Sequence, residues 1–112
     1  MEVIKFADLP DVATSHDIDL RKFVLVAAGK YPEGKMSNFS LHKLNQSETI
    51  EFESQKELLL IIQSDGSSHV KCITERACQT HDLITIPPES VVSITNNDEI
   101  PSLFYCLNWS LE

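Results

Sequence analysis

The chain has 112 residues, of which 42% are apolar, and its formal net charge is −8. This length predicts one domain, residues 1–112, with a single hydrophobic core. The acidic charge argues against nucleic acid and anionic membranes as partners, because Lys and Arg are needed to contact phosphate groups.

Strand signals recur along the whole chain, whereas helical periodicity is almost missing. Segments rich in Val, Ile, Leu, Phe and Thr alternate with polar clusters that are typical of turns. In chain order, we expect strands at Glu2–Phe6, Leu20–Val26, Ser37–Leu44, Thr49–Phe52, Glu57–Ser64, His69–Thr74, Asp82–Ile86, Ser90–Thr95 and Ser102–Ser110. Turns are expected at 30–34, at Asp65-Gly66 and at 96–99. Many short strands at this spacing are typical of an all-β sandwich or barrel.

Signals for export or membrane insertion are missing from the sequence. The N-terminal segment is acidic and interrupted by Pro10, so it lacks the basic and apolar regions of a secretory signal. The longest apolar run, Leu58 to Ile62, is too short to span a bilayer. The chain has three cysteines, and an odd number indicates free thiols rather than a disulfide framework. We therefore expect a cytoplasmic protein without a membrane partner.

Residues 81–96 carry a motif whose spacing is intact although several of its residues are replaced. Pro87 and Asn96 stand at the proline and asparagine positions, whereas Glu89 replaces a glycine and Val92 replaces a histidine. This spacing resembles the second motif of the cupin superfamily. The resemblance implies a single-domain antiparallel β-barrel or jelly roll. It also implies a homodimer, which would cover exposed edge strands.

The first cupin motif, which supplies His-x-His and a glutamate in that family, has no histidine here. Three ways of counting place its two histidine positions on Glu51 and Glu53, on Ile50 and Phe52, or on Glu53 and Gln55. Transition metals prefer sites that contain imidazole. The chain has four histidines, and they are isolated in the sequence: His16, His42, His69 and His81. We therefore predict no metal and no cofactor.

Polar residues alternate along the segment from Glu51 to Glu57, so on one strand they would share a face. Such a face is either a solvated outer surface or the polar wall of a cavity, and the motif positions favour the cavity. The residues that we predict to bind a ligand are Glu53, Gln55, Glu57, Val92 and Asn96.

The sequence favours metal-independent binding of a sugar- or metabolite-like small molecule in the barrel cavity. A second hypothesis is an enzyme. Metal-free cupins that isomerise or epimerise sugars use a histidine base and a tyrosine acid, which His42 and Tyr105 could supply. An oxygenase with an atypical metal site built from His42, Glu53, Gln55 and Glu57 is a further enzymatic possibility. A third hypothesis is a purely structural module for protein association.

Overall fold

The computed structural model describes residues 2–5 and 35–110, and every element in these ranges is a β-strand. The strands are β1 (Glu2–Lys5), β2 (Lys35–Leu44), β3 (Thr49–Glu53), β4 (Leu58–Asp65), β5 (Ser68–Lys71), β6 (Glu75–Cys78), β7 (Asp82–Ile86), β8 (Val91–Thr95) and β9 (Ser102–Ser110). Within these residues, no helix has the length and apolar character needed to cross a membrane.

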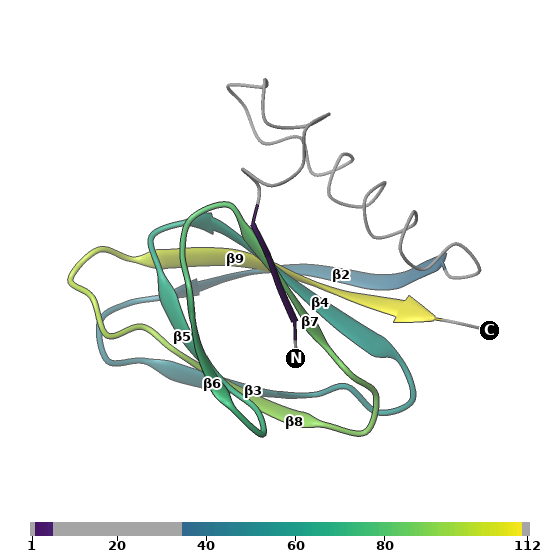
Figure 1. Cartoon of the computed structure of the whole chain (residues 1–112). Coiled ribbons are helices and arrows are strands. Elements are labelled where there is room, and N and C mark those ends of the chain that lie inside the picture. The colour runs from purple at the N-terminus through teal and green to yellow at the C-terminus, as the bar shows by residue number, and fades with distance from the viewer. Residues whose placement is uncertain (1, 6–34, 111–112) are drawn as a thin grey trace.

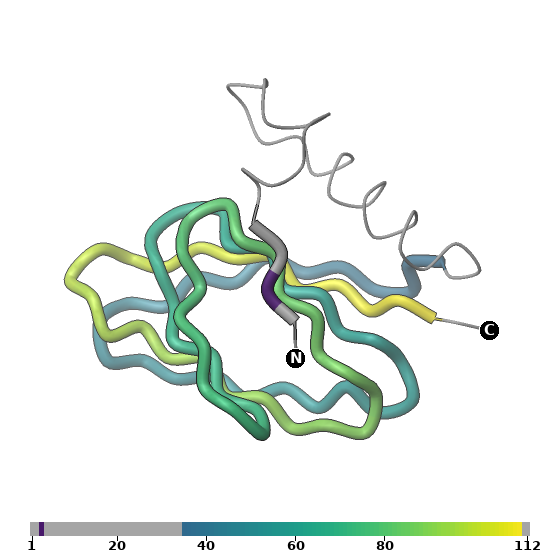
Figure 2. The backbone as a smooth tube through the Cα atoms, viewed as in Figure 1, coloured from purple at the N-terminus to yellow at the C-terminus, as the bar shows by residue number. Residues whose placement is uncertain are grey.

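Two antiparallel sheets face each other. The larger has five strands in the order β1-β7-β4-β9-β2, and the smaller has four in the order β3-β8-β5-β6. In Figure 1, β2, β4 and β9 lie on one side of the molecule and β3 and β8 lie on the other. Figure 2 shows how the chain passes repeatedly from one sheet to the other, as in a jelly roll.

The core fills the space between the sheets. It contains residues of the large sheet, such as Ile61, Ile84 and Phe104, and residues of the small sheet, such as Val92 and Ile94. β4 and β7 are buried along nearly their whole length. This burial explains why their sequences are almost continuously apolar rather than alternating. By contrast, β3 alternates between exposed and partly buried positions, so only one of its faces packs on the core.

Most of the expected strands are present in the described ranges. The segment expected as one strand from His69 to Thr74 is instead divided: β5 ends at Lys71, a turn follows, and β6 begins at Glu75. A backbone hydrogen bond from Cys72 N to Thr74 O, 2.9 Å long, closes that turn. The sequence Glu-Arg-Ala-Cys of β6 has weak strand propensity and becomes a strand by pairing with β5. The strand expected at 20–26, the turn at 30–34 and His16 lie outside the described residues.

Gly66, in the turn between β4 and β5, has a positive φ of 68°. A Cβ atom at this position would lie 2.5 Å from the backbone oxygen of Pro101. We expect Gly66→Ala to lower the free energy of unfolding by about 2 kcal/mol. The new Cβ atom would clash with the backbone, and alanine disfavours the positive φ that this turn requires. Chemical denaturation would measure this loss. The neighbouring Ser67→Ala should change the free energy by less than about 0.5 kcal/mol, and equal losses would contradict the explanation.

Candidate functional site

A cavity of about 980 Å³ opens between the two sheets. It lies where β2 begins, β3 ends, β4 begins and β9 ends, which is one end of the barrel. The lining residues are Ser37, Asn38, Ser40, His42, Phe52, Glu53, Ser54, Gln55, Lys56, Glu57, Leu59, Cys106, Asn108 and Ser110. Most of these side chains carry hydrogen-bonding groups, and the volume is within the range of small-molecule sites.

A β-bulge shapes the wall formed by β2. The pairing of β2 with β9 shifts register between Met36 and Asn38, which leaves Ser37 as the extra residue. As a result Ser37 and Asn38 both line the cavity, although neighbouring residues of a regular strand would point to opposite faces. The Ser37 hydroxyl donates a hydrogen bond to carboxylate oxygen Oε2 of Glu57. This contact joins β2 to the opposite rim of the cavity.

The opposite rim is the turn from Ser54 to Glu57, closed by a 3.1 Å hydrogen bond from Glu57 N to Ser54 O. Ser54 is buried, and its hydroxyl donates to Pro87 O at 2.8 Å and accepts from Ser90 N at 2.9 Å. Gln55 has a positive φ of 54°. This turn is therefore fixed by contacts to a second loop, and its side chains from Gln55 to Glu57 are held at the cavity mouth.

The rings of His42 and Phe52 line the cavity, and the fully buried ring of Phe104 packs against both of them. The rings of His42 and Phe104 are stacked with centroids 5.5 Å apart, and the ring of Phe52 meets His42 edge-on at 4.9 Å. Ring nitrogen Nε2 of His42 lies 2.8 Å from the Ser40 hydroxyl. Burial lowers the pKa of His42 from its ordinary value of 6.5, because the charged imidazole loses hydration among these rings. His42 is therefore neutral at neutral pH.

The lowered pKa of His42 has a consequence for stability. Above pH 6.5 the imidazole is neutral in both the folded and the unfolded chain; as the pH falls below 6.5, the unfolded chain takes up a proton first. The free energy of unfolding should therefore decrease with falling pH in this window, and His42→Gln should remove that part of the decrease. Denaturant unfolding of both proteins at about pH 5 and about pH 8 measures it. Identical pH profiles would contradict the assignment.

Three of the predicted ligand-binding residues, Glu53, Gln55 and Glu57, lie on the rim of the cavity. The other two lie away from it. Val92 is fully buried in the core opposite Phe52. Asn96 is also fully buried, and its side-chain amide donates to the backbone oxygens of Leu44, the last residue of β2, and of Ile100, a loop residue. Both motif positions therefore serve the fold, because their side chains are enclosed by protein rather than facing the cavity.

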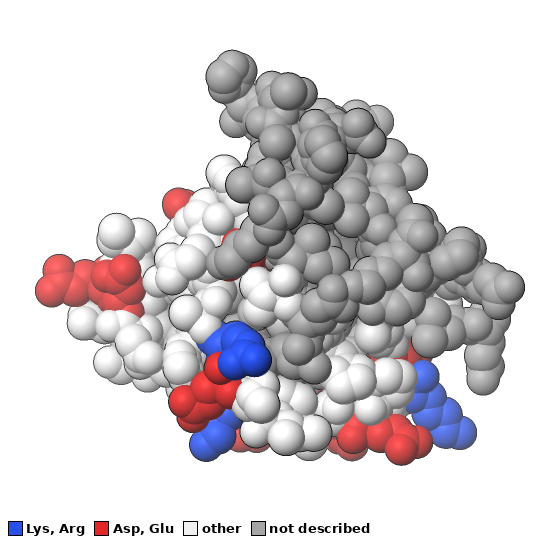
Figure 3. Space-filling model, viewed as in Figure 1, with Lys and Arg blue, Asp and Glu red and all other residues white. Residues whose placement is uncertain are grey.

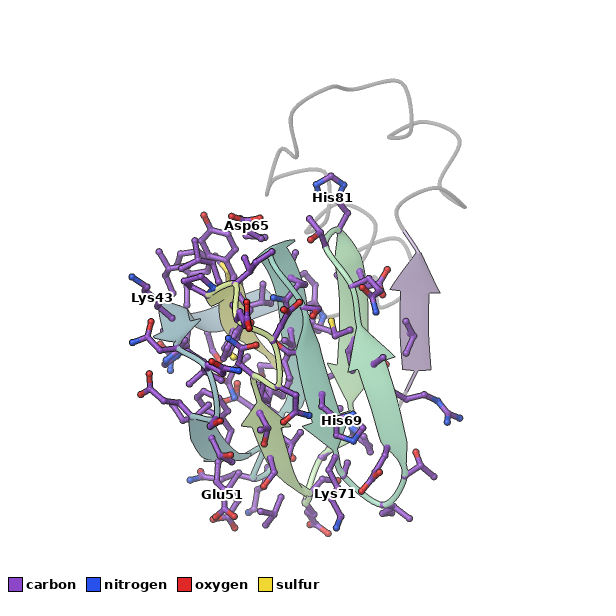
Figure 4. The ribbon with its side chains drawn as sticks, turned by 90° about the vertical axis from the view of Figure 1, so that its left-hand side faces the viewer. Lys43, Glu51, Asp65, His69, Lys71 and His81 are labelled. Atoms are coloured by element: carbon purple, nitrogen blue, oxygen red, sulfur yellow. The ribbon has the colours of Figure 1, made fainter. Side chains whose placement is uncertain are left out.

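Of the possible histidine positions on β3, only Ile50 and Phe52 face inward, whereas Glu51 and Glu53 are exposed. Figure 4 shows Glu51 on the outside of the barrel. β3 ends at Glu53, so Gln55 and Glu57 belong to the turn and do not continue the strand. The alternating polar run is therefore not one cavity wall: its first member is a solvated outer residue, and its later members reach the rim.

The structure does not bring His42 and Tyr105 together. On the paired strands β2 and β9, His42 lies opposite Phe104, and Tyr105 lies opposite Leu41. Residues directly opposite each other share a face of the sheet, so His42 faces inward and Tyr105 faces outward. Tyr105 stacks on Phe39 there, with ring centroids 5.3 Å apart. The register therefore places the two members of the predicted acid–base pair on opposite faces of the sheet.

A transition metal has no suitable donor set in the described part of the cavity. No group of three or more His, Cys, Asp or Glu residues lies close enough to hold a metal ion in the ranges that the structure covers. His42 is surrounded by Ser40 and two phenylalanine rings instead of other donors. Cys106 lines the cavity, but burial raises the pKa of its thiol to about 12, which keeps it protonated. These residues therefore do not fit the transition-metal site that the resemblance to cupins would imply.

Several residues of the cavity wall were not predicted. They are the small polar residues of β2 and β9, namely Ser37, Asn38, Ser40, Asn108 and Ser110. A partial signal existed, because alternation along β2 places Ser40 on the same face as His42. The sequence has no signal for the bulge that turns Ser37 toward the cavity. It also has no signal for the β2–β9 register that places Asn108 beside the polar residues of β2.

The geometry defines a jelly-roll barrel with one polar-lined open end, and comparison with known proteins identifies its type. No protein-family model matches the sequence, and a search of curated proteins gives no match. Solved structures do match. The plu4264 protein of Photorhabdus luminescens has a TM-score of 0.60 at 20% identity, over 69% of this chain and 73% of its own.

Two further matches carry the cupin description. A cupin 2 conserved barrel domain protein of Salinispora arenicola has a TM-score of 0.59 at 15% identity, over 69% of this chain and 74% of its own. The CENP-C cupin domain of Drosophila melanogaster has a TM-score of 0.58 at 14% identity, over 62% of this chain and 55% of its own. CENP-C has also been solved bound to CAL1. At these identities the likeness shows the fold: the chain has a cupin-like fold, as the sequence motifs predicted.

Proposed function

We propose that the chain binds a small polar molecule in the cavity, without a metal ion. The observation that carries this proposal is a cavity of about 980 Å³ with hydrogen-bonding side chains on its walls and rings of His42 and Phe52 inside. Small-molecule sites combine an apolar base with a few polar groups in this way. His42 alone supplies a neutral imidazole without the tyrosine partner that the isomerase hypothesis requires, which favours binding over catalysis.

Closing the cavity tests this proposal. Asn108 lines the cavity from β9 and is partly exposed, so Asn108→Phe would fill space there. Ser93→Phe places the same side chain on the outward face of β8 and serves as the control. A panel of sugars, polyols, amines and carboxylates would be screened by thermal shift, and hits measured by calorimetry. We expect hits that Asn108→Phe abolishes and Ser93→Phe retains. Hits unaffected by Asn108→Phe would contradict the proposal.

We propose further that two copies associate through β2. β2 is an edge of the large sheet and is ten residues long. Its outward residues Phe39 and Leu41 are exposed, and Tyr105 stacks beside them. An apolar edge of this length favours strand pairing with a second copy. Sedimentation should show a dimer that Leu41→Lys dissociates and that Val91→Lys, an exposed site on the small sheet, leaves intact. A wild-type monomer would overturn this part.

The chemistry of the cysteines supports a place in the cytoplasm. Cys72, Cys78 and Cys106 form no disulfide bond, which is the usual state of cysteines in a reducing compartment. Counting free thiols in protein isolated from its native cells would test this proposal, and a disulfide-linked form would contradict it.

A further inference from the structure

The charges around the cavity indicate which molecules can enter it. Its described lining contains two carboxylates, Glu53 and Glu57, and one ammonium group, Lys56, and no arginine. The whole chain carries a formal net charge of −8. Binding of phosphate or carboxylate groups typically uses Arg or several Lys residues, because their charge must replace the lost hydration. An anionic ligand would here meet an excess of negative charge.

Glu57 has the position required to bind a cation. Its Oε2 atom accepts the hydrogen bond from Ser37, and its Oε1 atom has no hydrogen-bond partner among the described residues. The carboxylate is thus held at the rim by one oxygen while the other is available. Glu57 is only partly exposed, so a charge placed beside it is less screened than one on the open surface.

The aromatic rings add a second, independent contribution. Phe52 and His42 both line the cavity, and their rings meet edge-on. Faces of aromatic rings attract ammonium groups and do not attract anions. Burial lowers the pKa of His42, so this ring does not add a competing positive charge at neutral pH. The hydroxyl and amide groups of Ser40 and Asn108 remain for neutral polar parts of a ligand.

We propose that the ligand is a hydroxyl-bearing amine, such as an amino sugar or an amino alcohol, whose ammonium group is bound by Glu57. This inference rests on the proposed small-molecule function and deepens it. Along the lower margin of the face in Figure 3, acidic and basic side chains lie side by side. The selectivity would then come from the residues of the cavity lining.

The test compares probes that share a frame and differ in charge. One set is glucosamine, glucose and glucuronate, and a second set is ethanolamine, ethylene glycol and glycolate. Calorimetry on the full chain at neutral pH should show the amine binding about tenfold more tightly than the neutral member of its set, which corresponds to about 1.4 kcal/mol. The anionic member should bind most weakly. Raising the salt concentration should reduce the differences.

Variants assign the preference to Glu57. Glu57→Gln keeps an acceptor for the Ser37 hydroxyl. In this variant the amine and the neutral member of each set should bind with about equal affinity. Glu51→Gln removes the same charge on the outside of the barrel, as Figure 4 shows, and should retain the preference. Lys56→Gln should increase it, because it removes the only ammonium group of the described lining. Unfolding curves would confirm that each variant is folded.

The outcomes separate this inference from the proposed function. If neutral or anionic members bind as tightly as the amines, the inference is wrong and the small-molecule function stands. If Glu57→Gln leaves the amine preference unchanged, the assignment to Glu57 is overturned. If no member of either set binds at millimolar concentration and the broad panel also gives no hit, the proposed function itself is overturned.

Discussion

Phe104→Ala should lower the free energy of unfolding by about 4 kcal/mol, because it removes a fully buried ring from the middle of the core. The Phe104 ring stacks on His42 of the neighbouring strand β2 and meets Phe52 of the opposite sheet edge-on, with centroids 6.5 Å apart. Its loss leaves a cavity between the sheets that few neighbours can fill. Equilibrium unfolding in urea, with far-ultraviolet circular dichroism as the readout, gives the change directly.

Phe39→Ala provides the matched control for Phe104. It removes the same side chain from the outward face of β2, where Phe39 is 41% exposed and contacts Tyr105. The expected loss is about 1 kcal/mol, because a large part of Phe39 already contacts water and only one aromatic contact is removed. Similar losses for the two variants would mean that Phe104 is not the central core residue described above.

Asn96→Ala should lower the free energy of unfolding by about 3 kcal/mol. The Asn96 amide nitrogen donates to Leu44 O at 2.9 Å and to Ile100 O at 3.0 Å, and its side-chain oxygen accepts from Asp98 N at 2.9 Å. The side chain is fully buried. Alanine leaves these backbone groups without partners in a site with little access to water, and each such loss costs about 1–3 kcal/mol. The measurement is the same urea titration.

A variant of the neighbouring residue Asn97 is the control for a general effect of changing this turn. Asn97 is exposed, and Asn97→Ala should change the free energy of unfolding by less than about 0.5 kcal/mol. The residue type, the turn and the truncation are the same, so burial and hydrogen bonding are the main difference. A loss of similar size at both positions would contradict the role given to Asn96.

The strands were predictable where composition and turn residues agree. β7 and β9 have the bounds that their sequences predicted, Asp82–Ile86 and Ser102–Ser110, because apolar runs are bounded there by clear polar clusters. The Asp65-Gly66 turn was predicted for the same reason. β6 was missed because its four residues have little preference for a strand and depend on β5 as a neighbour. Tertiary pairing outweighs local propensity in such a segment.

The cavity could be predicted only in part. Motif spacing led to Glu53, Gln55 and Glu57 on the rim, since spacing follows chain position. Side-chain direction depends on strand register, and a shift of one residue turns every side chain to the other face. That is why His42 and Tyr105 could be placed on their own strands but not relative to each other.

Backbone hydrogen bonds join the turn at the cavity mouth, Ser54 to Glu57, to the loop that precedes β8. Ser54 N donates to Ser90 O at 2.9 Å, and Glu89 N donates to Gln55 O at 2.5 Å. A molecule bound by Glu57 would restrain the opening of this turn and thereby the opening of the loop before β8. Amide hydrogen exchange at Glu89 would then slow on binding, although this residue does not line the cavity. Hydrogen exchange in this loop would thus reveal whether the cavity holds a ligand, although the loop residue measured lies outside the cavity.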